Sequence, residues 1–271
     1  WGWRCWRAIL QSAREERLDA LNVQFQTAAY GMHPAIHLAP PRRSRPPVVV
    51  TFHDLKVPYL FPKAGPLRRW VVRLLAHRTE GVIVTNREDE LQIVNENWRV
   101  KNLTRIPIGS NVAPQLPPGY DRDGWRAKWE VETSDLLLGY FGFLNERKGG
   151  EDLIETLAVL LERGLSTHLL LIGGRAGSSD PTNAAYAERV DRLIEERDLT
   201  GRVHRTGFVS PEEVSASLKA VDVCVLPYRD GASLRRGSLH ACLAHGRPIV
   251  TTHPAVETPE LRDGENVLLA N

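Results

Sequence analysis

At 271 residues, 42% hydrophobic and 25% charged, the chain is long enough for one large or two ordinary domains. No apolar run approaches the roughly 18 residues that span a bilayer, and the N-terminus lacks the basic and then apolar order of a signal peptide, which favours a cytoplasmic protein. Three scattered cysteines are too few for a disulfide framework or a zinc site.

The net charge of +2 hides an asymmetry between the two halves. Residues 1–130 contain 20 Lys and Arg against 12 Asp and Glu, whereas residues 131–271 contain 15 against 21, so the halves carry +8 and −6. A basic half can face an anionic partner or membrane surface, and solvated surface charge is the simpler explanation. We expect no nucleic-acid partner and leave open a peripheral contact with the inner membrane face.

The first half alternates short apolar runs with helical patterns, which predicts βαβ units and a parallel sheet. Strands are predicted at 18–26, 48–52, 81–85 and 103–108, and helices at 3–17, 66–77 and 87–97. The helix at 66–77 is amphipathic with a basic face, which fits a covering helix or a contact with anionic lipid. Residues 112–134 break the pattern with several prolines and then charged residues, which is typical of a linker.

The second half repeats the alternation. Strands are predicted at 136–141, 168–172, 203–206, 221–226 and 248–251, and helices at 150–163, 184–197, 211–220 and 237–245. The sequence therefore predicts two doubly wound α/β domains facing a cleft: residues 1–113, a linker at 114–134, and residues 135–271.

Two loops of the second half carry groups that bind anions. The loop between strand 136–141 and helix 150–163 contains Gly142, Asn145 and Lys148, at the strand end where ligands bind and a helix begins. An ordinary connection with a solvated lysine is the alternative. The loop after strand 221–226 offers guanidinium, hydroxyl and backbone N–H donors just before a helix. Its candidate residues are Asp230, Ser233, Arg235, Arg236, Gly237 and Ser238.

The first half offers one candidate for chemistry. His53 follows the apolar strand 48–52, at a carboxyl end where a histidine is well placed to act on a ligand. A histidine hydrogen-bonded to a neighbouring loop is the alternative. We find no metal-ligand cluster, GxSxG elbow or Walker-type phosphate loop, so we expect no metal site.

These features occur in an order that resembles the group 1 retaining glycosyltransferases of the GT-B fold. The motifs that carry the resemblance lie at 51–54, 82–85, 105–109, 139–142 with 148–149, 171–174, 207–209, 222–227, 244–250 and 263–266. Each motif is weak alone, but their order and spacing together are fairly specific. The resemblance covers nearly the whole chain.

The resemblance implies transfer of a sugar, with retention, from a nucleotide-diphosphate sugar in residues 135–271 to an acceptor on residues 1–113. No metal and no cofactor beyond this co-substrate is implied. Lys148 matches the lysine that contacts donor phosphate, and His53 matches the histidine near the reacting sugar. The basic first half makes a phosphorylated or lipid-linked acceptor worth testing beside a free sugar.

Three positions depart from the family pattern. Phe143 stands where the family usually has arginine, and Ser233 and Ala241 stand where it has paired glutamates. We expect Asp230 with the Arg235–Arg236 pair to substitute for them. The absent glutamates also leave open a non-catalytic nucleotide or nucleotide-sugar binding protein, or a nucleotide-sugar epimerase or hydrolase on the same fold.

The ends of the chain depart as well. The resemblance implies a first strand with a glycine-rich loop and a last helix that returns to the N-terminal domain, and neither is recognisable here. We therefore expect a fragment or a compact variant with an incomplete N-terminal domain and modest activity. An incomplete sheet exposes an edge, so we also expect association with another copy.

Overall fold

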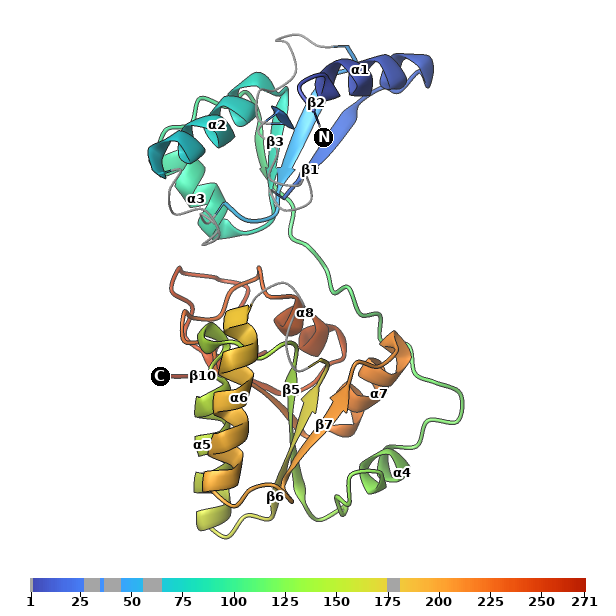
Figure 1. Cartoon of the computed structure of the whole chain (residues 1–271), viewed down its shortest axis with the longest axis vertical. Helices are drawn as coiled ribbons and strands as arrows, with labels where there is room; N and C mark the ends of the chain where they lie inside the picture. The colour runs from blue at the N-terminus through green and yellow to red at the C-terminus, as the bar shows by residue number, and fades with distance from the viewer. Residues whose placement is uncertain (1, 27–34, 37–44, 56–64, 175–180) are drawn as a thin grey trace. The chain divides into compact units, whose positions relative to one another are not determined.

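The chain folds into two compact units. The computed structural model describes residues 2–26, 35–36, 45–55, 65–174 and 181–271, and it divides into Trp1–Ile108 and Gly109–Asn271 (Figure 1). Each unit has a hydrophobic core of its own. The division falls five residues before the predicted end of the first domain at 113, and it assigns residues 114–134 to the second unit.

The first unit holds a four-stranded parallel sheet in the order β1-β2-β3-β4. Its strands are β1 (Leu21–Phe25), β2 (Val48–Phe52), β3 (Gly81–Val84) and β4 (Leu103–Arg105), and its helices are α1 (Cys5–Glu15), α2 (Gly65–Arg78) and α3 (Arg87–Asn95). Val48, Val50 and Phe52 of the inner strand β2 are buried and lie on one face of the sheet, because side chains two residues apart in a strand point the same way. On the other face Thr51 is buried and Val49 is partly buried.

The second unit holds a six-stranded parallel sheet in the order β10-β9-β8-β5-β6-β7. Its strands are β5 (Leu136–Phe141), β6 (Thr167–Ile172), β7 (Val203–Gly207), β8 (Val223–Leu226), β9 (Ile249–Thr252) and β10 (Leu268–Ala270). Its helices are α4 (Arg122–Ala127), α5 (Gly150–Glu162), α6 (Pro181–Glu196), α7 (Pro211–Ala220) and α8 (Gly237–Ala244), with a short 3-10 turn η4 (Glu146–Lys148). The predicted α/β class with parallel sheets is confirmed.

Helices cover both faces of the second sheet. Helices α5 and α6 pack together on one face, and α4 and α7 pack together on the other (Figure 1). All six residues of β6 are buried, which explains why this strand has no alternation of polar and apolar residues. None of the described helices combines the length and the apolar character that crossing a bilayer requires.

The segment predicted as a linker contains a helix that is anchored to the second unit. Arg126 of α4 is 1% exposed and forms an ion pair with Asp222, which lies just before β8, at an N–O distance of 3.0 Å. The same guanidinium donates to the carbonyl oxygens of Ala220, Glu132 and Asp135. These bonds fasten α4 to the end of α7 and to the entry of β5.

Candidate active site

The strand order of the second unit creates a switch point between β5 and β8. These strands are neighbours although β6 and β7 lie between them in the sequence, so the sheet extends in opposite directions from this pair. The loops that leave their carboxyl ends, residues 142–149 and 227–236, are the two loops in which the sequence predicts anion-binding groups. In open α/β sheets, ligands bind in the crevice at such a point.

The two loops are in direct contact. Gly149 has a left-handed backbone with φ of 65°, and a Cβ atom there would lie 2.1 Å from the carbonyl oxygen of Pro227. The backbone N–H of Arg229 donates to the carbonyl oxygen of Arg147 over 2.9 Å. Glycine is therefore required at position 149 both by its conformation and by the close approach of the second loop.

Lys148 reaches across the first loop to the exit of β5. Its Nζ lies 3.2 Å from the point that a Cβ would occupy on Gly142, and the Cβ of Ser238 lies 3.9 Å from the same point. The Asn145 side chain caps η4 by accepting the backbone N–H of Lys148 over 3.2 Å. The predicted residues Gly142 and Ser238 thus lie near the ammonium group of Lys148, and Asn145 holds the backbone of the same lysine.

The environment of Lys148 disfavours its charge. Burial and, to a smaller extent, the nearby Arg236 guanidinium lower the pKa of its ammonium from 10.5 to about 8. Within the described part of the chain, no carboxylate forms an ion pair with this ammonium. A desolvated cation without a counterion, beside a second cation, is suited to receive an anionic ligand.

Arg236 is held by two contacts within its own loop. Its guanidinium forms an ion pair with Asp230 and lies over the ring of Tyr228, with Cζ 5.0 Å from the ring centroid. The hydroxyl of Tyr228, a residue 1% exposed, lies 2.7 Å from Oγ of Ser238. A buried tyrosine therefore connects the guanidinium of Arg236 with the hydroxyl of Ser238.

Helix α8 begins at this cluster. It starts at Gly237, Ser238 is its second residue, and no side chain caps its first turn. The N–H groups of a first turn have no partner within the helix, and the helix dipole places partial positive charge there. Ser233 is buried and stabilises the preceding loop, since its carbonyl oxygen accepts the N–H of Arg236 and its hydroxyl accepts the N–H of Arg235.

His53 lies in the first unit, at the carboxyl end of β2 as predicted. Its Nε2 is 2.7 Å from Oε1 of Gln24 on the neighbouring strand β1, and its carbonyl oxygen accepts the hydroxyl of Thr85 over 3.4 Å. The ring is thus oriented by the side chain of Gln24. Its side chain is partly exposed, so it is accessible to a ligand.

Sequence reasoning missed the part played by Tyr228 and Arg229. The Pro-Tyr pair directly after β8 was the available signal for Tyr228, because a tyrosine that is buried needs a partner for its hydroxyl. Arg229 belongs to the same predicted anion-binding loop, and its guanidinium donates two hydrogen bonds, of 2.7 and 3.0 Å, to the carboxylate of Asp152 at the start of α5. Arg229 therefore links the loop after β8 to the start of α5.

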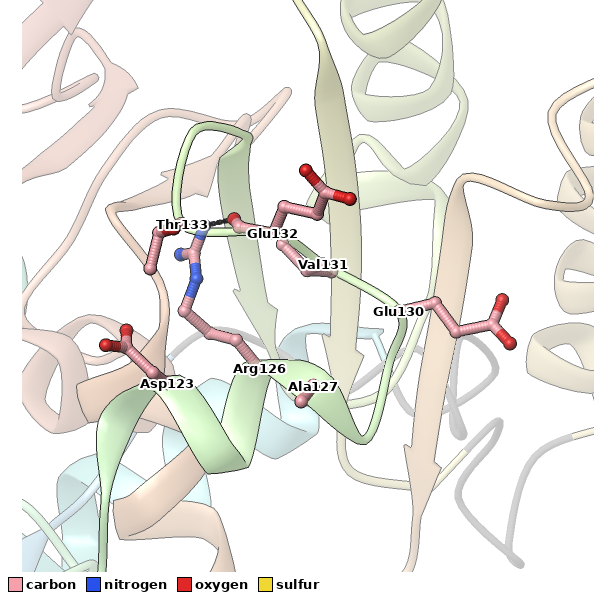
Figure 2. A pocket seen from close by; sticks show the side chains of 7 residues that line it. All are labelled: Asp123, Arg126, Ala127, Glu130, Val131, Glu132 and Thr133. Carbon is pink, nitrogen blue, oxygen red and sulfur yellow. Dashed lines mark hydrogen bonds between the residues drawn. The ribbon is translucent and has the colours of Figure 1, made fainter.

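A pocket of about 480 Å³ lies away from this site, beside α4 (Figure 2). Its lining residues are Asp123, Arg126, Ala127, Glu130, Val131, Glu132 and Thr133. Arg126 is committed to Asp222 at the amino end of β8, and the three carboxylates disfavour an anion. This pocket does not fit the predicted ligand.

The described residues contain no group of three His, Cys, Asp or Glu side chains that could hold a metal ion.

Two family models match the chain and together cover most of it. The model described as glycosyl transferases group 1 matches residues 135–271, and a glycosyl transferase 4-like domain matches residues 2–109. The first match contains every predicted site residue of the second unit, and the second match contains His53.

Two curated glycosyltransferases are similar to this chain at low sequence identity. D-inositol 3-phosphate glycosyltransferase of Corynebacterium jeikeium is 26% identical over 176 residues, which are 63% of this chain and 41% of the relative. The putative glycosyltransferase EpsD of Bacillus subtilis is 24% identical over 239 residues, which are 84% of this chain and 57% of the relative. The chain thus spans about half the length of these relatives.

Solved structures share the fold. HepE of Anabaena, crystallised with UDP and glucose, is 20% identical with a TM-score of 0.74, and the match covers 97% of this chain and 66% of that protein. Sucrose-phosphate synthase of Thermosynechococcus elongatus is 21% identical with a TM-score of 0.66, over 93% of this chain and 60% of that protein.

Proposed function

Because the chain belongs to the glycosyl transferases group 1 family, we propose that it transfers a sugar from a nucleoside-diphosphate sugar to an acceptor. The observation that carries the proposal is the ammonium of Lys148, desolvated and without an ion pair among the described residues, at the switch point of the second sheet. A diphosphate is the anion that this family's donors would bring to such a cation.

The charges of the second unit fit the departure of a nucleoside diphosphate. When the bond from the sugar to the diphosphate breaks, negative charge grows on the leaving oxygen. Lys148, Arg236 and the N-terminus of α8 supply fixed positive charge around the exit of β5, and such charge stabilises the transition state more than the ground state. We extend the proposal to a reaction without a metal ion, in which these groups neutralise the diphosphate.

His53 completes the proposal from the first unit. We assign it a contact with a hydroxyl of the reacting sugar or with the positive charge that develops on its ring, and we assign retention of the anomeric configuration. The hydrogen bond of its Nε2 with Gln24 supports a fixed ring orientation. The relative named for D-inositol 3-phosphate supports testing a phosphorylated polyol as acceptor, which also fits the +8 charge of residues 1–130.

Calorimetric titration with UDP, GDP, ADP and their glucose or mannose esters tests the donor site. We expect the wild type to bind one nucleotide at micromolar concentration and Lys148→Ala to weaken it at least tenfold, or about 1.4 kcal/mol. Lys128→Ala is the matched control, because Lys128 is an exposed lysine of the second unit that lies over Trp125, away from the crevice. Equal affinities of the wild type and Lys148→Ala would contradict the proposal.

A non-catalytic nucleotide-binding protein is the second candidate. Ala241 is fully buried in α8 and Ser233 is a buried loop residue, so neither position offers the carboxylate that the family's members use. Incubation of a bound nucleotide-sugar with phosphorylated and free acceptors separates the candidates. Product that requires an acceptor supports the transferase, and binding without any turnover supports the second candidate. Turnover without an acceptor would indicate an epimerase or hydrolase.

A further inference from the structure

Two phenylalanine side chains are exposed at the carboxyl edge of the second sheet. Phe143 follows β5 and is 41% exposed, and Phe208 follows β7 and is 90% exposed. Phenylalanine is normally buried, since burying such a side chain stabilises the folded state by roughly 1.5–3 kcal/mol. Two exposed rings on one sheet edge are therefore a feature that folding does not explain.

The two rings approach the same glycine. A Cβ atom on Gly174, at the end of β6, would lie 2.9 Å from Cε1 of Phe143 and 3.9 Å from Cδ2 of Phe208. Strand β6 lies between β5 and β7, so the three strand ends are adjacent. Any side chain at position 174 would displace the ring of Phe143, which means that glycine keeps this space open.

The backbone that carries Phe208 is fixed. The N–H of Gly173 donates to the hydroxyl of Thr206 over 3.0 Å, and Gly173 pairs with Gly207 in an isolated bridge. The exit of β7 is thereby tied to the exit of β6, one residue before Phe208. The exposed ring projects from a defined position at the strand end.

The aromatic pair adjoins the cationic site. A Cβ on Gly173 would lie 3.8 Å from the backbone nitrogen of Gly142, the residue over which Nζ of Lys148 lies. Going from β8 to β7 along the strand ends, the charged groups of Lys148 and Arg236 come first and the two uncharged rings follow. A ligand with a charged part and a flat apolar part matches this order.

We propose that Phe143 and Phe208 form an aromatic platform that stacks the base of the donor nucleotide, which deepens and rests on the proposed function. The base is the planar part of a nucleoside diphosphate, and it lies one ribose away from the phosphates at Lys148. Every base has a π-face that stacks on an aromatic ring, and phenylalanine has no hydrogen-bonding group, so the platform itself tolerates different bases. Phe143 thus contacts the base at the position where the family pattern has arginine.

Titration with the nucleoside diphosphate that the wild type binds most tightly, chosen from UDP, GDP and ADP, tests the platform beside inorganic pyrophosphate. We expect Phe208→Ala and Phe143→Ala each to weaken the nucleotide at least about fivefold, the lower end of the range for stacking on an aromatic residue. Pyrophosphate affinity should stay within about twofold. Phe208→Trp should retain nucleotide affinity because it retains a ring.

Leu165→Ala is the matched control, since Leu165 is 48% exposed and precedes the amino end of β6, at the opposite edge of the sheet. Unchanged nucleotide affinity in both alanine variants would overturn the platform, while a Lys148→Ala effect in the same titration would leave the proposed function standing. Equal losses for nucleotide and pyrophosphate would also overturn it. A wild type that binds no nucleotide would overturn both proposals.

Discussion

At the residue scale, Lys148 binds its proton less tightly in the folded protein than it would in the unfolded chain. Burial and the Arg236 charge lower its pKa to about 8, against the usual 10.5. Below pH 8 both states carry the proton, and the folded state bears the full cost of a desolvated charge. Between about pH 8 and 10.5 the unfolded state binds more protons, so this group makes the free energy of unfolding rise with pH.

We therefore predict that Lys148→Met stabilises the ligand-free protein. The variant removes the buried charge and keeps an unbranched side chain that is one atom shorter. We expect a gain of about 1 kcal/mol at pH 7, within the usual range for a stabilising substitution. Urea unfolding at pH 7 and pH 10 measures it. The gain should shrink at pH 10, where Lys148 is neutral in the folded state, and a gain that is equal at both pH values would contradict this origin.

Tyr228 is a second residue whose contribution can be isolated. Tyr228→Phe removes the hydroxyl that pairs with Ser238 over 2.7 Å and keeps the ring beneath Arg236. We predict a loss of about 1 kcal/mol in stability, the usual net value of a buried hydrogen bond, and a few-fold loss in nucleotide affinity because Ser238 is no longer oriented. Tyr186→Phe is the control and should affect stability alone, since it removes a hydroxyl that accepts the backbone N–H of Glu151 on α5.

At the element scale, α4 depends on a partner far along the chain. Burial alone would raise the pKa of the Asp222 carboxyl. The carboxylate accepts hydrogen bonds from the backbone N–H of Leu137 and from the guanidinium of Arg126, and these contacts lower its pKa overall. Because that pKa is lowered, the stabilisation is present at neutral pH and is lost as pH falls through the lowered pKa.

We predict that Asp222→Asn destabilises the second unit by about 3 kcal/mol, since it leaves the charge of Arg126, a residue 1% exposed, without its counterion. Urea unfolding followed by circular dichroism measures the loss. Asp123→Asn changes an exposed carboxylate of the same helix and should cost less than about 0.5 kcal/mol. A loss of stability in Asp222→Asn as small as that in Asp123→Asn would show that the Arg126 ion pair contributes little.

The regular elements were predictable because each is specified locally. Six consecutive apolar residues predicted β5 at 136–141 with its observed bounds. Helix α4 was missed because it is short and lacks an apolar stripe, and its main contact joins residues 96 positions apart. Strand β4 ends at Arg105, before the predicted 108, because Pro107 has no N–H to donate to a ladder.

At the scale of the whole molecule, the candidate site arises from topology. Lys148 and Arg236 were each predicted from their own loops, since loops after parallel strands share one edge of a sheet. The direct contact of these loops depends on β8 lying next to β5, an order that local patterns do not encode. The hydroxyl pair of Tyr228 and Ser238 likewise depends on how one loop folds over its helix.

The second unit contains a complete core, the switch point and all the cationic groups of the proposed donor site. We therefore predict that a fragment of residues 109–271 folds and binds the donor nucleotide within about threefold of the full chain. A fragment of residues 135–271, which begins at the predicted domain boundary, lacks α4 and leaves Asp222 without Arg126. Its free energy of unfolding should be about 3 kcal/mol lower than that of the longer fragment, so it should unfold at a lower urea concentration.

Calorimetry and urea unfolding of the two fragments separate the two parts of this prediction. Equal stability would mean that residues 109–134 contribute nothing to the second unit and that Arg126 is dispensable. Loss of nucleotide binding in a folded 109–271 fragment would mean that residues of the first unit hold the nucleotide. The proposal that Lys148, Arg236 and α8 suffice for its diphosphate would then be wrong, even though Lys148→Ala weakens binding in the full chain.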